Sequence, residues 1–435
     1  MNMLIVNSNL YRYSYKPYQY IFIMAIALFF PGMVSSFGLL LEQCLTMGLF
    51  LVGVVCIILY KPLLPKGVLY ISFLLYAYFQ IIITIDLLRS TDIIITSDFF
   101  EIAKPLYLYV FFIMPFCFMR TLHDVELVTK YLMIFCIILA LFGIMEAWTK
   151  IGYDISTLLY KPIRDVLKNK AVASFIITYT FASFLVIPFF YYLTRFFSKK
   201  RFFNKDLIFL FLVLVCIFST QSKTVFISIL ITLFLYLFLC LLYSFSLNKK
   251  KIILTILVLI VSLSVSLGVL ASVFSEHFSY IYNGLDVVLT TLIDKGFINA
   301  LNSTPSISLR VEQFEFALDA QDSIPLIGVA IGKGVLMPES FYALYLYRTG
   351  IIGIILHLSI VLYLFVSSYK CARFFANKNN IHMYSWFMAL HFYALSLPFS
   401  YFSSAVNDQT RTGFVFYFLI ASTIFIRRRI CNYGK

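Results

Sequence analysis

The feature that most constrains this chain is a series of long stretches without a charged residue. Twelve of them hold 15 or more residues, and their bounding charges lie at 16–42, 42–61, 66–86, 104–120, 130–146, 170–195, 206–223, 223–249, 251–276, 348–370, 378–408 and 411–427. A charged side chain at the bilayer centre costs several kcal/mol, so charges should bracket membrane spans of about 20 residues. The sequence therefore predicts an all-α polytopic membrane protein with about twelve transmembrane helices.

Composition excludes other classes of protein. Of the 435 residues, 62% are hydrophobic and only 12% are charged, and the mean hydropathy is +0.93. Soluble domains carry about 25% charged residues. The 48 Phe and 31 Tyr also exclude a disordered or fibrous chain, because such chains are poor in large apolar side chains.

The basic residues indicate an orientation, since Lys and Arg collect on the cytoplasmic side of a membrane. With the N-terminus inside, the cytoplasmic segments hold 21 Lys and Arg against three acids, and the outer segments hold 13 basic and 17 acidic residues. Both termini are therefore predicted to be cytoplasmic. The net charge of +14 is explained by topology, so we expect no nucleic-acid partner. We also expect no cleaved signal peptide, no disulfide and no metal site.

We treat residues 1–435 as a single transmembrane domain with two notable outer segments. Residues 148–170 form a basic extracytoplasmic loop that includes Lys161 and Arg164. Residues 275–338 form a large extracytoplasmic loop, predicted to contain amphipathic helices. Within it, Pro305 marks a helix entry, followed by a three-to-four-residue rhythm of Ile307, Arg310, Phe314, Ala317 and Leu318.

Several motifs in and after this loop resemble a known family. They are Ser-Leu-Arg (308–310), Pro-Leu-Ile-Gly (325–328), Gly-Lys-Gly (332–334), Glu-Ser-Phe-Tyr (339–342) and Tyr-Arg-Thr-Gly-Ile-Ile-Gly (347–353). Together they resemble the signature region of the O-antigen ligase and polymerase superfamily. Ser-Thr-Gln-Ser-Lys (219–223) is a further match, with Lys223 where the family often has Arg. Glu339 stands where ligases tend to carry His-Asn.

The resemblance implies a fold like that of the inverting integral-membrane glycosyltransferases of GT-C type, in a bacterial inner membrane. It implies an O-antigen polymerase that joins repeat units carried by undecaprenyl diphosphate, without a metal or other cofactor. Membrane lipid and a chain-length regulator protein are the other expected partners. A ligase of the same superfamily and a flippase for the same lipid-linked units remain the alternatives; a flippase should show two similar halves around a charged cavity.

The chemistry of this reaction assigns roles to two residues. Departure of the sugar from its diphosphate builds negative charge, which the forked guanidinium of Arg310 can stabilise. Since no acid lies three or four residues from Arg310 on its helix, we expect its charge to be free. Glu339 is the candidate base for the acceptor hydroxyl, and the alternative is a carboxylate that complements a helix dipole.

The remaining candidate residues have a structural alternative as well. Lys223, Arg348, Arg164 and Lys161 are candidates for diphosphate binding, and each could instead anchor the chain at the lipid headgroups. Arg348 either lines a cavity or lies on a helix that projects beyond the membrane. Tyr342 and Ser340 are candidates for contact with the acceptor sugar.

For seven other residues we favour a structural role. Gly350 and Gly353 suit close helix packing. His357 and His391 suit hydrogen-bonded packing. Asn407, Asp408 and Arg411 suit capping of the last helix, and the alternative is that they face the same cavity.

Overall fold

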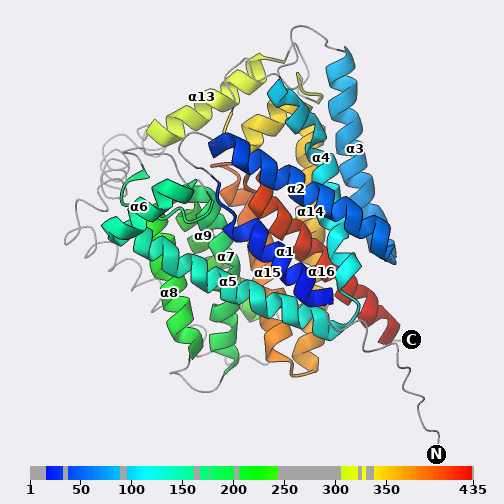
Figure 1. Ribbon diagram of the computed structural model, residues 1–435, viewed down its shortest axis with the longest axis vertical. Coiled ribbons are helices and arrows are strands. Elements are labelled where there is room, and N and C mark those ends of the chain that lie inside the picture. The colour runs from blue at the N-terminus through cyan, green and yellow to red at the C-terminus, as the bar shows by residue number, and fades with distance from the viewer. Residues whose placement is uncertain are drawn as a thin grey trace, which may run out of the picture.

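The computed structural model describes residues 16–32, 38–88, 96–160, 167–175, 177–199, 205–242, 305–321, 326–329 and 338–433. These residues form α-helices and one 3-10 turn, and contain no strand (Figure 1). The elements are α1 (Lys16–Phe29), α2 (Gly38–Tyr60), α3 (Lys66–Leu88), α4 (Thr96–Phe118), α5 (Leu122–Trp148), α6 (Lys150–Leu159), α7 (Thr178–Ser198), α8 (Lys205–Thr220), α9 (Lys223–Leu242), α13 (Pro305–Asp319), α14 (Phe341–Asn377), α15 (Ile381–Ser400), η3 (Val406–Asp408) and α16 (Thr410–Tyr433).

The helices fit a protein that crosses a membrane several times. Five of those described are long and apolar enough to span, namely α2, α3, α5, α7 and α14. Helix α7 is almost wholly buried inside the bundle, whereas α2 exposes most of its apolar side chains. The all-helical class is therefore confirmed, while the count of twelve spans and the GT-C fold stay predictions.

The charge-free windows predicted the positions of the helices well. Each window contains a helix, apart from 251–276, which lies outside the described residues. The segments 148–170 and 275–338, whose outer location stays a prediction, contain α6 and α13, respectively, and α13 begins at Pro305 as predicted.

The helix ends gather at two ends of the bundle. At one end, the Lys16 ammonium lies 4.4 Å from the ring centre of Tyr60, and an Arg429 Nη2 donates to the Arg120 carbonyl at 2.6 Å. The first contact joins the start of α1 to the end of α2, and the second joins α16 near its end to the residues that follow α4. The other end carries α13, the start of α14 and the end of α15 (Figure 1). We call these the opposite end and the α13 end.

Arg411 ties three helices together at the α13 end. Its side chain is 2% exposed. The guanidinium pairs with the Glu42 carboxylate at 3.1 Å and donates to the carbonyl oxygens of Ala27, Leu28 and Phe30. Arg411 therefore caps the end of α1. The prediction that it caps the last helix is wrong, because the open carbonyls of α1 lie within its reach.

Helix α14 is broken at Gly350. An ideal helix of 37 residues would be about 55 Å long, well beyond the roughly 30 Å hydrocarbon core of a bilayer. Gly350 has φ 64° and ψ −165°, a region open essentially to glycine alone. A Cβ there would also overlap the Leu326 carbonyl. Gly350 therefore allows α14 to break at this point, and the prediction that it is a helix-packing glycine is wrong.

Candidate functional site

The two residues assigned to catalysis meet at the α13 end. An Nη2 of Arg310, on α13, lies 2.6 Å from Oε2 of Glu339, which precedes α14. The Arg310 side chain is 22% exposed and that of Glu339 is 51% exposed. The expectation that Arg310 carries an unneutralised charge is therefore wrong: its acid partner lies 29 residues away in sequence and was invisible to an analysis of its own helix.

Gln313 holds this ion pair in place. Its Oε1 accepts from Arg310 Nη1 at 3.2 Å and from the backbone N–H of Glu339 at 3.0 Å. The Gln313 side chain is 3% exposed, so this bridge is shielded from water. Sequence analysis missed Gln313, although its spacing of three residues from Arg310 was the available signal.

The Glu339 side chain does not cap α14. The N-cap is Ser340, which is buried and makes no side-chain capping bond. Glu339 instead reaches sideways to α13. Among the described residues, Arg310 pairs with its carboxylate through Oε2, and about half of the Glu339 side chain is exposed.

Aromatic side chains surround the pair. The Tyr179 hydroxyl, at the start of α7, hydrogen-bonds Ser404 and lies within electrostatic range of Glu339 and Arg310. The Tyr342 hydroxyl donates to the Pro398 carbonyl at 2.8 Å, at the end of α15. The Tyr342 hydroxyl proton is therefore already engaged, while Tyr179 is a neighbour that sequence analysis did not identify.

One face of α13 packs on α14 and another is exposed. Arg310, Gln313 and Ala317 face α14, whereas Phe314 and Leu318 are 42% and 39% exposed. Apolar contacts join the polar bridge of Gln313 here, because Phe316 stacks on Tyr347. The prediction that α13 is an amphipathic helix lying on the outer face of the membrane stays a prediction.

Arg348 lies at the end of the first half of α14 and is only 4% exposed. Its backbone is crossed by residues 326–329, where Val329 N–H donates to the Tyr347 carbonyl at 2.7 Å. A Cβ on Gly328 would overlap the Arg348 carbonyl. The Arg348 side chain is therefore enclosed by protein, and its place within or beyond the membrane stays a prediction.

A second basic group of the α13 end lies around Lys223. The loop at 167–175 packs against the end of α8, because Ala171 N–H donates to the Ser219 carbonyl at 2.8 Å and Gln221 Nε2 donates to the Asn169 carbonyl at 3.2 Å. This contact brings Lys170 within electrostatic range of Lys223. Burial lowers the pKa of the Lys170 ammonium, and the charge of Lys223 lowers that pKa further.

The loop that carries Lys170 is rigidly held. The buried Glu146 carboxylate accepts the backbone N–H groups of Val172 and Ala173 at 2.8 and 2.7 Å. Around the two lysines, Asn169, Ala173 and Gln221 all have positive φ. A non-glycine residue in this region costs about 1–3 kcal/mol and persists only where its surroundings impose it. Such strain is concentrated at functional sites.

Lys223 also lies at an unfavourable position for a cation. It is the first residue of α9, where the helix dipole is positive. Lys170 adds a second ammonium to this helix N-terminus. Because backbone N–H groups there attract anions, Lys170, Lys223 and the start of α9 form a region suited to phosphate.

The predicted site residues thus fall into three places. Arg310 and Glu339 are in contact, and Ser340 and Tyr342 follow Glu339 in sequence. Lys223 lies near Lys170. Arg348 is buried further along α14. Lys161, Arg164 and the Gly-Lys-Gly motif at 332–334 lie outside the described residues. No family model and no curated protein matches this chain.

Proposed function

We propose that this protein is a polysaccharide polymerase, a glycosyltransferase that joins oligosaccharide repeat units carried by undecaprenyl diphosphate. The product would be O-antigen or capsular polysaccharide, made at the outer face of a bacterial inner membrane. The observation that carries the proposal is the half-exposed Arg310–Glu339 pair between α13 and α14. It joins a cation suited to phosphate to a half-exposed carboxylate, both on motifs that resemble those of the superfamily.

The acceptor hydroxyl attacks the anomeric carbon of the growing chain, and its proton passes to Glu339. The glycosidic bond to the lipid diphosphate breaks, and its electrons leave with the diphosphate. Attack from the opposite side inverts the anomeric configuration. Glu339 supplies the base, while cations stabilise the charge on the leaving group.

Arg310 can link the binding of the diphosphate leaving group to the release of Glu339 as the base. In the structure its Nη2 binds Glu339 and its Nη1 binds Gln313. A diphosphate oxygen that takes over Nη2 would release the carboxylate to accept a proton. Arginine suits this exchange because its fork binds carboxylate and phosphate with the same geometry.

The direct test uses purified protein in liposomes with synthetic undecaprenyl-diphosphate-linked repeat units as the only substrate. We expect products with two or more repeat units. Arg310→Ala should reduce their formation by about 10²–10³-fold, the effect of removing one charge-stabilising donor. Transfer of units across the bilayer without elongation would support the flippase alternative and overturn the proposal.

A deletion strain separates the remaining alternative. Loss of a polymerase should leave surface glycan with a single repeat unit, seen as one band on a gel of surface polysaccharide. Loss of a ligase or a flippase should remove repeat units altogether. Complete absence of repeats would therefore contradict a polymerase.

A further inference from the structure

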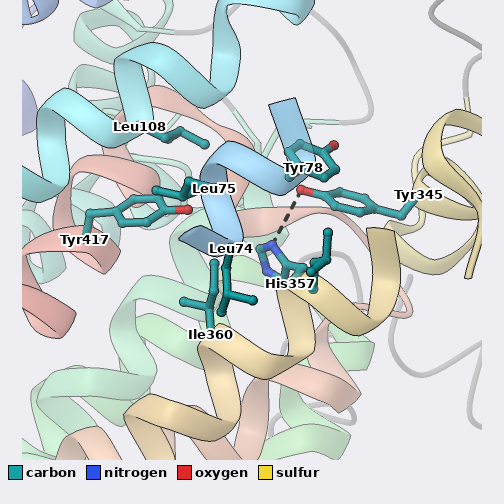
Figure 2. A pocket seen from close by; sticks show the side chains of 9 residues that line it. Leu74, Leu75, Tyr78, Leu108, Tyr345, His357, Ile360 and Tyr417 are labelled. Carbon is teal, nitrogen blue, oxygen red and sulfur yellow. Dashed lines mark hydrogen bonds between the residues drawn. The ribbon is translucent and has the colours of Figure 1, made fainter. Parts of the chain in front are cut away.

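A buried polar network connects both halves of α14 to α15 and η3. Tyr345 Oη donates to Asp408 Oδ1 at 2.8 Å, and His357 Nε2 lies 2.8 Å from Tyr401 Oη. His357 Nδ1 faces Tyr345 Oη at 3.5 Å (Figure 2). Lys104, on α4, pairs with Asp408 at 3.6 Å. The prediction that Asp408 caps the last helix is therefore wrong.

The direction of the hydrogen bonds fixes the protonation of His357. Tyr393 Oη donates to Asn407 Oδ1 at 3.1 Å, which turns the amide nitrogen of Asn407 toward Tyr401, to whose oxygen it donates at 2.7 Å. The proton of Tyr401 is then directed at His357 Nε2. Nε2 is an acceptor, so the ring is neutral and its proton is on Nδ1, facing Tyr345.

This network spans the break in α14. Tyr345 precedes Gly350 and His357 follows it, so their contact joins the two half-helices. The ring of Phe341 packs against both, with its centre 4.2 Å from that of Tyr345 and 4.8 Å from that of His357. Phe341 comes two residues after Glu339. The network therefore determines where the first half of α14, and with it Glu339, is placed.

Little water is available to replace a lost hydrogen bond here. The adjoining cavity measures about 10 Å³, room for about one water molecule. Several titratable groups of the described residues lie near His357. They are Tyr78 on α3, Tyr345 on α14, Tyr401 after α15, Tyr417 on α16 and Asp408 on η3. Lys104 on α4 acts on His357 through its pair with Asp408.

We propose that Tyr345, His357 and Asp408 are positioning residues that lock the broken helix and hold Glu339 against α13, and that His357 does so as a neutral acceptor at Nε2. A second proton on His357 would face the Tyr401 oxygen, which already accepts from Asn407. The Tyr401 proton would then lose its acceptor, and the lock would have to rearrange. The effect of this lock on catalysis rests on the proposed function, whereas the existence of the lock does not.

The protonation of His357 is tested by solid-state ¹⁵N NMR on histidine-labelled protein in lipid bilayers, with the His357 signals assigned by their loss in His357→Gln. We expect, at neutral pH, a protonated Nδ1 and an unprotonated Nε2. A ring protonated at Nε2, or at both nitrogens, would overturn the assignment.

The positioning role is tested without any substrate, through the labelling of Ser340→Cys by a water-soluble maleimide. Ser340 is 5% exposed, so labelling requires movement of the start of α14. Adding Tyr345→Phe removes the hydrogen bond to Asp408 and should speed labelling about tenfold, as expected for a lost hydrogen bond to a charged group. The matched control is Tyr363→Phe, on the same helix, where the hydroxyl binds Ser367. Equal labelling rates in the Tyr345→Phe protein and its parent would overturn the lock.

Elongation assays then separate the lock from the proposed function. Wild-type elongation should fall as the pH drops, because both the proposed base Glu339 and His357 take up a proton. His357→Gln, which can accept from Tyr401 but cannot titrate, should make this acid limb shallower and leave the part due to Glu339, whereas His391→Gln should leave the limb unchanged, because His391 binds the Phe365 carbonyl outside the network. A limb unchanged in His357→Gln would contradict the role of His357. If the NMR and labelling results hold but no elongation occurs, the proposed function fails and the lock stands.

Discussion

The two ends of the bundle each hold an arginine–carboxylate pair, and the pairs differ in burial. At the opposite end, Asp206 is 4% exposed and binds Arg195 at 3.1 Å together with Lys199. At the α13 end, Glu339 is 51% exposed and binds a single arginine. A buried pair is costly to break, whereas an exposed one contributes little to stability. Asp206 is thus suited to fixing helix ends, and Glu339 to exchanging its partner.

The largest expected effect contrasts these two carboxylates. Glu339→Gln keeps a hydrogen-bond acceptor for Arg310 but cannot serve as a base, so elongation should fall about 10²–10⁴-fold. Its thermal unfolding in detergent should stay close to wild type. Asp206→Asn should instead lower the unfolding temperature, because it leaves two cations without their buried partner, at a cost of about 3–5 kcal/mol.

The elongation rate and the unfolding temperature together decide whether each carboxylate has a catalytic or a structural role. If Glu339→Gln retains full elongation, the carboxylate serves only to attach α13. If Asp206→Asn unfolds like wild type, burial does not distinguish the two pairs and the comparison fails.

A charge swap sharpens the same comparison at the α13 end. Arg310→Glu combined with Glu339→Arg can form the ion pair again with its charges reversed. We expect normal membrane insertion and expression but elongation still reduced at least about 100-fold, because the donor and the base are then in each other's place. Recovery of elongation in the double variant would show that the pair is purely structural.

The sequence predicted most helices because long apolar runs leave few alternatives in a membrane. It misplaced helix ends where a charge is buried and paired. Lys104 lies within α4, where it binds Asp408, and Glu146 lies before the end of α5, where it binds Val172 and Ala173. A rule that treats every charge as a boundary cannot recognise charges that the protein itself solvates.

The candidate site was predictable only in part. The motifs indicated Arg310 and Glu339 but not their contact, which depends on how α13 packs beside α14. The sequence shows a glycine at position 350, but the break of α14 at Gly350 depends on the close approach of the Leu326 backbone. Lys170 was one of several basic residues in its segment, and only the packing of its loop on α8 distinguishes it. Contacts between distant segments, rather than local pattern, therefore complete the site.

The smallest expected effect concerns Lys170, whose ammonium should assist diphosphate binding. Its pKa is lowered by burial and by Lys223, so it loses its proton at a lower pH than an ordinary lysine. The charged form binds the anion, and the KM for lipid-linked substrate should therefore rise as the pH increases through the lowered pKa. Lys170→Gln should raise the KM about tenfold at neutral pH, the effect of one lost charge-assisted hydrogen bond.

Two further variants show whether the effect belongs to Lys170. Lys170→Arg keeps its charge at all accessible pH values and should flatten the alkaline rise in KM, because a guanidinium does not titrate there. Lys168→Gln is the matched control, since Lys168 is exposed on the same loop, and it should leave both KM and its pH dependence unchanged. If Lys168→Gln and Lys170→Gln change the KM equally, the α13 end attracts its substrate by general charge rather than through a defined pair of lysines.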